Sequence, residues 1–507
     1  MKSNTGIFTI LTTIALTVCL AASGQAQSKG VVIKGRAPVN NKPLKITLPR
    51  AYETKLANGL QIIVLENHKL PTFAMQMVIR SGGLADPAGQ EGTAQYVATM
   101  LREGTSKRSS RQIAETIDSL GASLGATASL SSLTSNVTAS GLTDQFDQIL
   151  ELFADVTLDP AFPKEELDKL KTRSLAQLRF QRSQPSFLAA EMFARVMYGT
   201  HPGGRFALNA EQIQRMTPEM LRAFHAAHYR PENAIFAIVG DVKPAAIVAK
   251  LEKTFGAWPR GAAPAGSIPS VSDVGASRIF LIDRPGSVQT NLILGAQTIE
   301  RTNPDYYALD VMNQVIGGGA SSRLFLNLRE DKGYTYGAYS SFNAPRYRGV
   351  FRASTEVRTD VTKGSMDELM YEIRRIRTDK VPADEFDRAK RTIIGSFALQ
   401  LESPQSLLGN IILQKLYGLP DDYWDTYPQK IAEITPEEVQ RVAQKYLDPD
   451  KIQIVAVGDA GKIAETLKKF GTLEVFDTEG RPVKQAPAST SSGNHAAADA
   501  EKRPRNQ

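Results

Sequence analysis

The sequence contains one unit twice, and this repeat constrains the fold more than any other feature. Residues 216–219 (MTPE) precede a short apolar run that ends at 240–241 (GD), and residues 434–437 (ITPE) precede a matching run that ends at 458–459 (GD). Each of these pairs is separated by 218 residues, and further matches upstream lie 219 residues apart. Because a unit of about 220 residues is far longer than a solenoid repeat, each copy is predicted to be a domain.

Each copy is predicted to mix strands with helices. Thr217 and Thr435 are expected to be helix N-caps, since each is followed by a proline, which suits the first position of a helix. The apolar runs that follow these helices are typical of buried strands. Asn58-Gly59, between two strand-like segments, indicates a β-hairpin. The predicted fold class is therefore α+β, with two homologous domains that each have a mainly antiparallel β-sheet and helices packed on one face.

Composition divides the chain into segments. The predicted organisation is a signal peptide over 1–26, a lead-in over 27–50, an N-terminal domain over 51–256, a linker over 257–278, a C-terminal domain over 279–478 and a disordered tail over 479–507. The linker is assigned from its content of proline, glycine, alanine and serine, and the tail from its lack of apolar periodicity.

The first residues indicate export. Lys2 provides a positive start, residues 7–20 are apolar, and small residues follow up to Ala26, which is typical of a cleavable secretory signal. Lipoprotein processing at Cys19 is a less favoured alternative, because Val18 is bulky where lipid attachment requires a small residue. We expect an exported protein, periplasmic or peripheral to the cell envelope. No transmembrane anchor is expected, since no later segment is apolar enough to span a bilayer.

Charge and cysteine content exclude several classes of function. The formal net charge is +7, but no basic stripe is interleaved with aromatic residues, so a nucleic-acid partner is not expected. Cys19 is the only cysteine and lies within the predicted signal, so the mature chain is expected to form no disulfide and no thiolate metal site. Gly317-Gly318-Gly319 is not followed by Gly-Lys-Ser/Thr, which argues against a phosphate-binding loop.

Three short segments resemble landmarks of the pitrilysin/insulinase family of zinc peptidases. They are residues 56–60 (LANGL), 82–86 (GGLAD) and 92–94 (GTA). The resemblance extends from about residue 50 to about residue 475. It is greatest to the short two-domain members, such as the mitochondrial processing peptidase subunits and their bacterial relatives. It implies two homologous domains in a clamshell arrangement.

The zinc-binding motif of this family is altered in this chain. In the family, His-x-x-Glu-His lies on a helix; the histidines bind zinc and the glutamate is the general base. Gln95 and Thr99 stand at the histidine positions, and Ala98 stands at the glutamate position. The third ligand, a downstream glutamate, corresponds to Gln177. Because amides, a hydroxyl and a methyl group are poor replacements for these donors, the resemblance implies no metal on this chain and zinc in a partner subunit.

Two histidines on one predicted helix do not suggest a substitute metal site. His225 and His228 have the i, i+3 spacing that places them on one helical face, but no third ligand is near them in sequence. They are interpreted as an exposed flank of the helix.

The second copy retains a pair that resembles the family's substrate-contacting residues. Arg329 and Tyr336 match an arginine and a tyrosine seven residues apart. The resemblance implies that the tyrosine hydroxyl helps to hold the oxyanion of the tetrahedral intermediate and that the arginine positions the peptide. The alternative is that Arg329 caps its helix and Tyr336 packs on a strand. Residues Gly317, Gly318 and Gly319 are expected to form a close turn that faces the substrate cavity.

Together these features predict a non-catalytic, substrate-positioning subunit of a heteromeric zinc metallopeptidase that acts on peptides. The expected partner is a homologous subunit with His-x-x-Glu-His, in a heterodimer or heterotetramer, and activity is expected only in the complex. The alternative is a structural or peptide-binding pseudo-peptidase with no role in proteolysis, similar to core subunits of respiratory complexes. A third, remote alternative is an enzyme with an unrecognised site.

Overall fold

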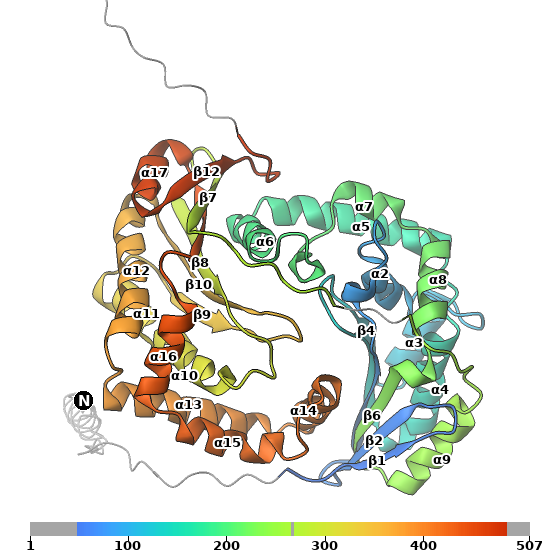
Figure 1. Ribbon diagram of the computed structural model, residues 1–507. Helices are drawn as coiled ribbons and strands as arrows, with labels where there is room; N and C mark the ends of the chain where they lie inside the picture. The colour runs from blue at the N-terminus through green and yellow to red at the C-terminus, as the bar shows by residue number, and fades with distance from the viewer. Residues whose placement is uncertain (1–47, 265–267, 484–507) are drawn as a thin grey trace, which may run out of the picture. The chain divides into compact units, whose positions relative to one another are not determined.

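Two six-stranded β-sheets organise the protein, seen here in a computed structural model that describes residues 48–264 and 268–483 (Figure 1). The first sheet has the order β1-β2-β6-β3-β5-β4, in which only β2 and β6 pair in parallel. Its strands are β1 Tyr52–Lys55, β2 Gln61–Glu66, β3 Thr72–Ile79, β4 Ser123–Thr127, β5 Ser135–Leu142 and β6 Ala234–Gly240. The predicted hairpin at Asn58-Gly59 is confirmed, since it joins the antiparallel strands β1 and β2.

The second sheet repeats the first, with the order β12-β7-β11-β8-β10-β9. Its strands are β7 Arg278–Asp283, β8 Gln289–Gln297, β9 Ala338–Phe342, β10 Val350–Arg358, β11 Gln453–Gly458 and β12 Thr472–Phe476. Strands β7 to β11 take the places of β2 to β6, and only the outer strand differs: β12 pairs in parallel with β7, whereas β1 is antiparallel to β2. The predicted α+β class with two homologous, mainly antiparallel sheets is confirmed.

Helices connect the strands of both copies (Figure 1). In the first copy they are α2 Thr93–Met100, α3 Ser110–Ser119, α4 Phe146–Leu158, α5 Lys164–Arg182, α6 Pro185–Tyr198, α7 Ala210–Arg215, α8 Pro218–His228 and α9 Pro244–Phe255. In the second they are α10 Tyr306–Ile316, α11 Arg323–Phe325, the π-helix η5 Leu326–Asp331, α12 Thr362–Thr378, α13 Ala383–Gln400, α14 Pro404–Tyr417, α15 Tyr423–Glu433, α16 Pro436–Tyr446 and α17 Ala460–Leu467. Short 3-10 turns are η1 Gly83–Ala85, η2 Thr143–Gln145, η3 Pro202–Gly204, η4 Pro231–Asn233, η6 Thr359–Val361 and η7 Lys468–Phe470.

The predicted N-caps of α8 and α16 are confirmed. The Thr217 hydroxyl accepts a hydrogen bond from the amide of Met220, and the Thr435 hydroxyl accepts one from the amide of Glu438. Each cap satisfies a backbone donor that has no partner inside its helix, which typically stabilises a helix by about 1 kcal/mol. The first residues of both helices were predicted correctly because the capping threonine and the proline that follows it are neighbours in the sequence.

Each sheet also packs against one helix from the other copy, which the prediction of helices on one face did not include. Helix α6 of the first copy lies on β8 and β11 of the second sheet (Figure 1), where Phe193 and Val455 share one buried cluster. Helix α14 of the second copy lies on β6 of the first sheet, where Ile411 and Ile235 share another buried cluster. The described residues accordingly belong to one compact unit.

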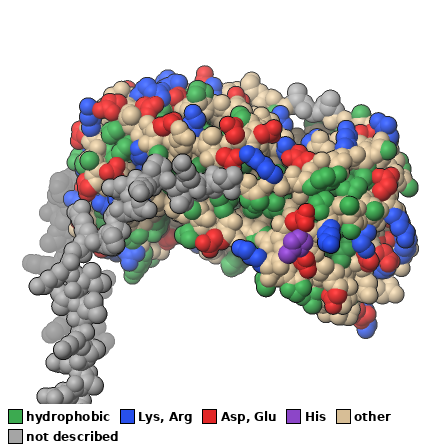
Figure 2. All heavy atoms as spheres, turned by 90° about the horizontal axis from the view of Figure 1, so that it is seen from below, with side chains coloured by type: hydrophobic (Ala, Val, Ile, Leu, Met, Phe, Trp, Pro, Cys, Tyr) green, Lys and Arg blue, Asp and Glu red, His purple; other side chains and the backbone are tan. Residues whose placement is uncertain are grey.

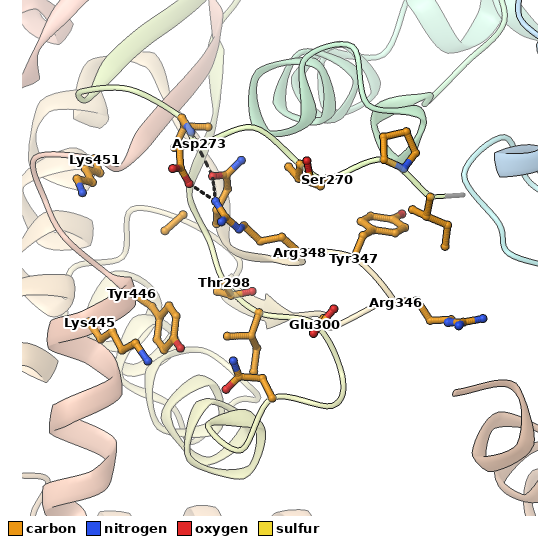
Figure 3. A pocket seen from close by; sticks show the side chains of 18 of the residues that line it. Ser270, Asp273, Thr298, Glu300, Arg346, Tyr347, Arg348, Lys445, Tyr446 and Lys451 are labelled. Carbon is orange, nitrogen blue, oxygen red and sulfur yellow. Dashed lines mark hydrogen bonds and ion pairs between the residues drawn. The ribbon is translucent and has the colours of Figure 1, made fainter. Parts of the chain in front are cut away.

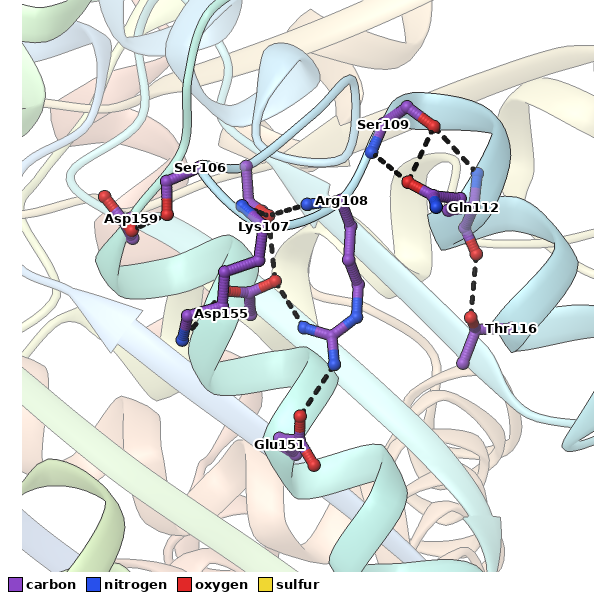
Figure 4. A network of polar contacts seen from close by, with 10 residues as sticks. Ser106, Lys107, Arg108, Ser109, Gln112, Thr116, Glu151, Asp155 and Asp159 are labelled. Atoms are coloured by element: carbon purple, nitrogen blue, oxygen red, sulfur yellow. Dashed lines mark hydrogen bonds and ion pairs between the residues drawn. The ribbon is translucent and has the colours of Figure 1, made fainter.

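A polar network fixes the turn that precedes α3 to helix α4 (Figure 4). The buried carboxylate of Asp155 accepts hydrogen bonds from the Thr105 hydroxyl at 2.8 Å and from Arg108 Nη1 at 2.6 Å. Arg108 Nη2 donates to Glu151 one turn earlier on α4. Because both terminal guanidinium nitrogens of Arg108 bond to α4, the turn that precedes α3 is attached to that helix.

The predicted linker and the start of the predicted tail are packed against the protein. In the linker, Val271 is buried, and the Pro269 carbonyl lies 3.0 Å from His201 Nε2. In the tail, the Gly480 carbonyl accepts a hydrogen bond from Arg195 of α6. The predicted signal peptide, most of the lead-in and residues 484–507 lie outside the described residues. Among the described helices, none is long and apolar enough to cross a membrane.

Candidate functional site

The helix that corresponds to the family's zinc-binding helix is α2, and Asp86 holds its first turn. The Asp86 carboxylate accepts hydrogen bonds from the amides of Gly92 at 2.7 Å and Ala94 at 2.8 Å. A carboxylate at this position also interacts favourably with the positive end of the helix dipole. The turn at residues 82–86 (GGLAD) therefore sets the direction in which α2 presents its side chains.

The three positions of the altered motif face different surroundings on α2. Gln95 is half-buried, Ala98 is buried, and Thr99 is exposed. The Thr99 hydroxyl donates a hydrogen bond to the Gln95 carbonyl within the helix at 2.9 Å. No imidazole or carboxylate projects from these positions, so these residues do not fit a zinc ion.

Gln95 and Gln177 line the same pocket, which has a volume of about 510 Å³. Gln177 comes from helix α5, so the structure joins two positions that lie far apart in the sequence. Ala98 and Thr99 do not line this pocket. The remaining lining residues are Tyr96, Ser129, Leu130, Arg173, Ser174, Leu178, Gln181, Phe187, Phe206, Ala207, Leu208 and Ile213. The sequence did not indicate Arg173, Phe187 or Phe206, because they carry no motif and meet only in the folded chain.

The interpretation of His225 and His228 as an exposed flank is wrong. His228 is buried, and its Nδ1 lies 2.9 Å from the Ser81 hydroxyl. His225 is largely shielded and its Nε2 lies 2.8 Å from the Thr157 carbonyl, while burial lowers the pKa of His225 to about 4. Both rings serve packing. Within the described chain, no group of three or more His, Cys, Asp or Glu side chains is arranged to hold a metal ion.

The Arg329–Tyr336 segment places its two side chains differently. Arg329 lies on η5, with its guanidinium 4.9 Å from the Phe325 ring, and its Nη1 donates to the Tyr336 carbonyl at 3.1 Å. The Tyr336 side chain is 91% exposed and precedes strand β9. The arginine thus fixes the backbone of the tyrosine, and the phenol hydroxyl remains free to contact another molecule.

The glycines at 317–319 form a close turn between α10 and α11, and Gly317 lies against β9. A Cβ on Gly317 would lie 2.2 Å from the Ser340 amide nitrogen, and a Cβ on Gly318 would lie 2.7 Å from the Gln314 Cα, so side chains at these two positions would clash. A Cβ on Gly319 would make only ordinary contact. The Ser340 amide donates to the Gly317 carbonyl, which caps part of the outer edge of β9.

A larger pocket of about 750 Å³ lies in the second copy, and no sequence motif indicated it (Figure 3). It is lined by parts of the linker, the end of β8, the 346–348 loop and the end of α16. Arg348 pairs with Asp273 across it, and the Thr298 hydroxyl in its wall has no hydrogen-bond partner in the described chain. Glu300 and Lys451 add opposite charges, so the lining does not favour a ligand of one charge.

The surface is also mixed in charge. Figure 2 shows one face of the molecule, on which acidic, basic and apolar side chains are interspersed without an extended field of either charge among the described residues. A positive field is the usual footprint of nucleic-acid binding. The visible face offers no such footprint.

Comparison with known proteins gives consistent matches along the chain. The family model described as Insulinase (Peptidase family M16) matches residues 61–210, and the model described as Peptidase M16 inactive domain matches residues 215–393. An uncharacterized zinc protease of Mycobacterium tuberculosis is 28% identical over 81% of this chain and 93% of its own length. One of Bacillus subtilis is 25% identical over 69% of this chain and 84% of its own length.

Solved structures agree with these matches. A Pseudomonas fluorescens structure described as a peptidase M16 inactive domain is 29% identical, with a TM-score of 0.74 over 81% of this chain and 98% of that chain. A Helicobacter pylori protease shares the fold, with a TM-score of 0.74 at 19% identity, over 81% of this chain and all of that chain. The chain belongs to the pitrilysin/insulinase family, peptidase family M16.

Proposed function

We propose that this chain is a non-catalytic, substrate-positioning subunit of a heteromeric zinc metallopeptidase that acts on peptides. One observation carries the proposal: the positions that should hold zinc present amides, a methyl group and a hydroxyl, while Tyr336 presents a free phenol to solvent. The first half of a peptidase site is chemically altered, and the second half is available.

The role proposed for the second half is to stabilise the reaction in a partner's site. A tyrosine hydroxyl can donate a hydrogen bond to the oxyanion that forms during peptide hydrolysis, and such a donor is worth about 100-fold or more in turnover. The Arg329 guanidinium holds the Tyr336 carbonyl at 3.1 Å and so fixes the approach of the phenol. In the complex, zinc held by the partner's His-x-x-Glu-His motif would activate the attacking water.

Reconstitution tests this assignment. The purified chain alone should contain no stoichiometric zinc by elemental analysis and should cleave no fluorogenic peptide. Addition of a homologous His-x-x-Glu-His subunit from the same host should produce activity. Tyr336→Phe should then lower turnover about 100-fold, because it removes only the hydroxyl, and Arg329→Ala should also lower turnover, with assembly unchanged in gel filtration.

Tyr371→Phe is the matched control, since Tyr371 is 51% exposed and lies on α12 rather than beside Arg329. Its turnover should equal that of the unsubstituted chain. Unchanged turnover in both the Arg329 and the Tyr336 variants would remove the proposed roles.

A second candidate is a structural or peptide-binding protein without a role in proteolysis. The contacts of Arg329 support this second candidate, because stacking on Phe325 and a hydrogen bond to a backbone carbonyl give the arginine a structural role. A stable homodimer in the native host, with no co-purifying zinc-binding homologue, would support this candidate over the first.

We further propose that the protein is exported to the periplasm or the periphery of the cell envelope. The support is the apolar run at 7–20 behind Lys2, which lies outside the described residues. Cell fractionation of the native host, with N-terminal sequencing of the mature chain, tests both the location and the processing site.

A further inference from the structure

The pocket that joins Gln95 and Gln177 has an apolar wall open to solvent. The rings of Phe187 and Phe206 lie edge to face with centroids 5.2 Å apart, and Phe206 is 42% exposed. Leu130 and Leu208 contribute further apolar surface. Exposed aromatic surface in a concave site is typical of places that receive an apolar group from another molecule.

One charged side chain lines this pocket, and it is a cation. Arg173 extends from α5, while no aspartate or glutamate lines the pocket. Lys164 on the same helix is paired with Asp168 at 2.6 Å. Arg173, by contrast, makes no ion pair with any residue in the described ranges. A single guanidinium without a counter-charge is complementary to one carboxylate, which it can bind through two parallel hydrogen bonds.

A buried hydroxyl in the same lining lacks a well-formed hydrogen bond within the described chain. Tyr96 is only 4% exposed, and its hydroxyl makes no well-formed hydrogen bond within the described chain, although Ser174 is near it. Burial raises the pKa of Tyr96, so the phenol stays neutral and able to donate. An unmet buried donor is costly, and a polar ligand or a water molecule in the pocket would remove that cost.

We propose that this pocket binds the C-terminal residue of a peptide, with a large apolar side chain against Phe187 and Phe206 and the free α-carboxylate at Arg173. The inference deepens the proposed function, on which it rests for the peptide class of the ligand. The amides of Gln95, Gln177 and Gln181 are available to hydrogen-bond the peptide backbone. A carboxylate carries one negative charge, which the single guanidinium of Arg173 matches.

Direct binding to the full-length chain tests the proposal without any partner. The probes are two N-acetylated, fluorescently labelled tripeptides that end in phenylalanine, one with a free carboxylate and one with a C-terminal amide. Fluorescence anisotropy should show about 10-fold or greater preference for the free acid, as expected for a charge-assisted pair. Arg173→Gln should abolish that preference and leave binding of the amide unchanged.

Phe206→Ser should weaken binding of both probes to a similar extent, because it removes apolar surface rather than charge. Matched controls come from helix α5: Arg179→Gln and Phe180→Ser alter exposed residues of the same types that do not line the pocket. Neither control should change the affinity of either probe. All four variants change exposed side chains, so circular dichroism should show the same fold for each.

Three results would overturn the inference: equal affinity for acid and amide, a preference that survives Arg173→Gln, or no saturable binding of either probe. These outcomes are separate from the reconstitution test, which depends on Arg329, Tyr336 and the partner. If reconstitution succeeds and the acid preference is absent, the proposed function stands and the pocket assignment falls. If the preference exists without reconstitution, the pocket assignment stands and the proposed function falls.

Discussion

The difference between this chain and the family's zinc motif lies in the side chains of α2 and not in the helix that carries them. Asp86 still caps α2 through two backbone amides, so Gln95 projects from a well-ordered turn. Gln177 reaches the same pocket from α5. The hydrogen bonds that hold the first turn of α2 are present, so the difference from the zinc motif comes from the side-chain donor atoms alone.

Asp305 gives a pH-dependent prediction at the same scale. Burial by itself would raise its pKa, but hydrogen bonds from Arg441, Lys445 and Tyr446 together outweigh burial and lower the pKa of Asp305 to about 2. An aspartate in an unfolded chain titrates near pH 3.9. The charged form is therefore favoured in the folded state, and its contribution to stability is fully present above about pH 4 and lost as the pH falls toward 2.

Asp305→Asn should therefore lower the free energy of unfolding by about 1–2 kcal/mol at pH 7, a value reduced from the full shift because Arg441 and Lys445 are half exposed. Urea denaturation at pH 7, 5 and 3 should show the difference between variant and parent shrinking at pH 3. Asp421→Asn, at a carboxylate that is 90% exposed, should show little difference at any pH. A constant deficit for Asp305→Asn across the series would contradict the assignment.

Among the elements, the π-helix η5 is the segment most directly tied to the proposed chemistry. It follows the short helix α11 and carries Arg329 toward the Tyr336 carbonyl. A π-turn inserts an extra residue per turn and redirects the side chains after it, and such turns are frequent at functional sites. Arg329 lies in this π-helical segment and bonds to the Tyr336 carbonyl, seven residues further along the chain.

Helix α6 supports a prediction about stability. The ring of Phe193 lies so close to β8 that a Cβ on Gly295 would come within 2.3 Å of it. Phe193 is 5% exposed, and loss of a buried phenylalanine ring typically costs about 3–5 kcal/mol. Phe193→Ala should lower the free energy of unfolding by about 3 kcal/mol in urea denaturation. Phe180→Ala is the control, since this ring on α5 is 62% exposed, and it should change the free energy of unfolding little. Equal losses of stability in the two variants would contradict the tight packing of α6 on the second sheet.

Across the whole molecule, features encoded by neighbouring residues were predictable and features made by distant residues were not. The repeat, the Thr217 and Thr435 caps and the β1–β2 hairpin follow from local spacing. His228 is buried against Ser81, which is 147 residues away, so the spacing of the two histidines along the helix could not indicate its burial. The pocket at Gln95 and the helices exchanged between copies depend on tertiary packing, which no local signal records.

The exchange of α6 and α14 carries a consequence for the origin of the chain. The two helices have equal length and equivalent positions in the repeat, and each covers the sheet of the other copy. A single unduplicated copy would leave an apolar sheet face bare in water, a cost that association with a second copy would remove. The ancestral unit is therefore expected to have been an obligate two-fold dimer with reciprocally swapped helices. Gene fusion would have made the two halves free to diverge, so that the first carries Gln95, Ala98 and Thr99 and the second carries Arg329 and Tyr336.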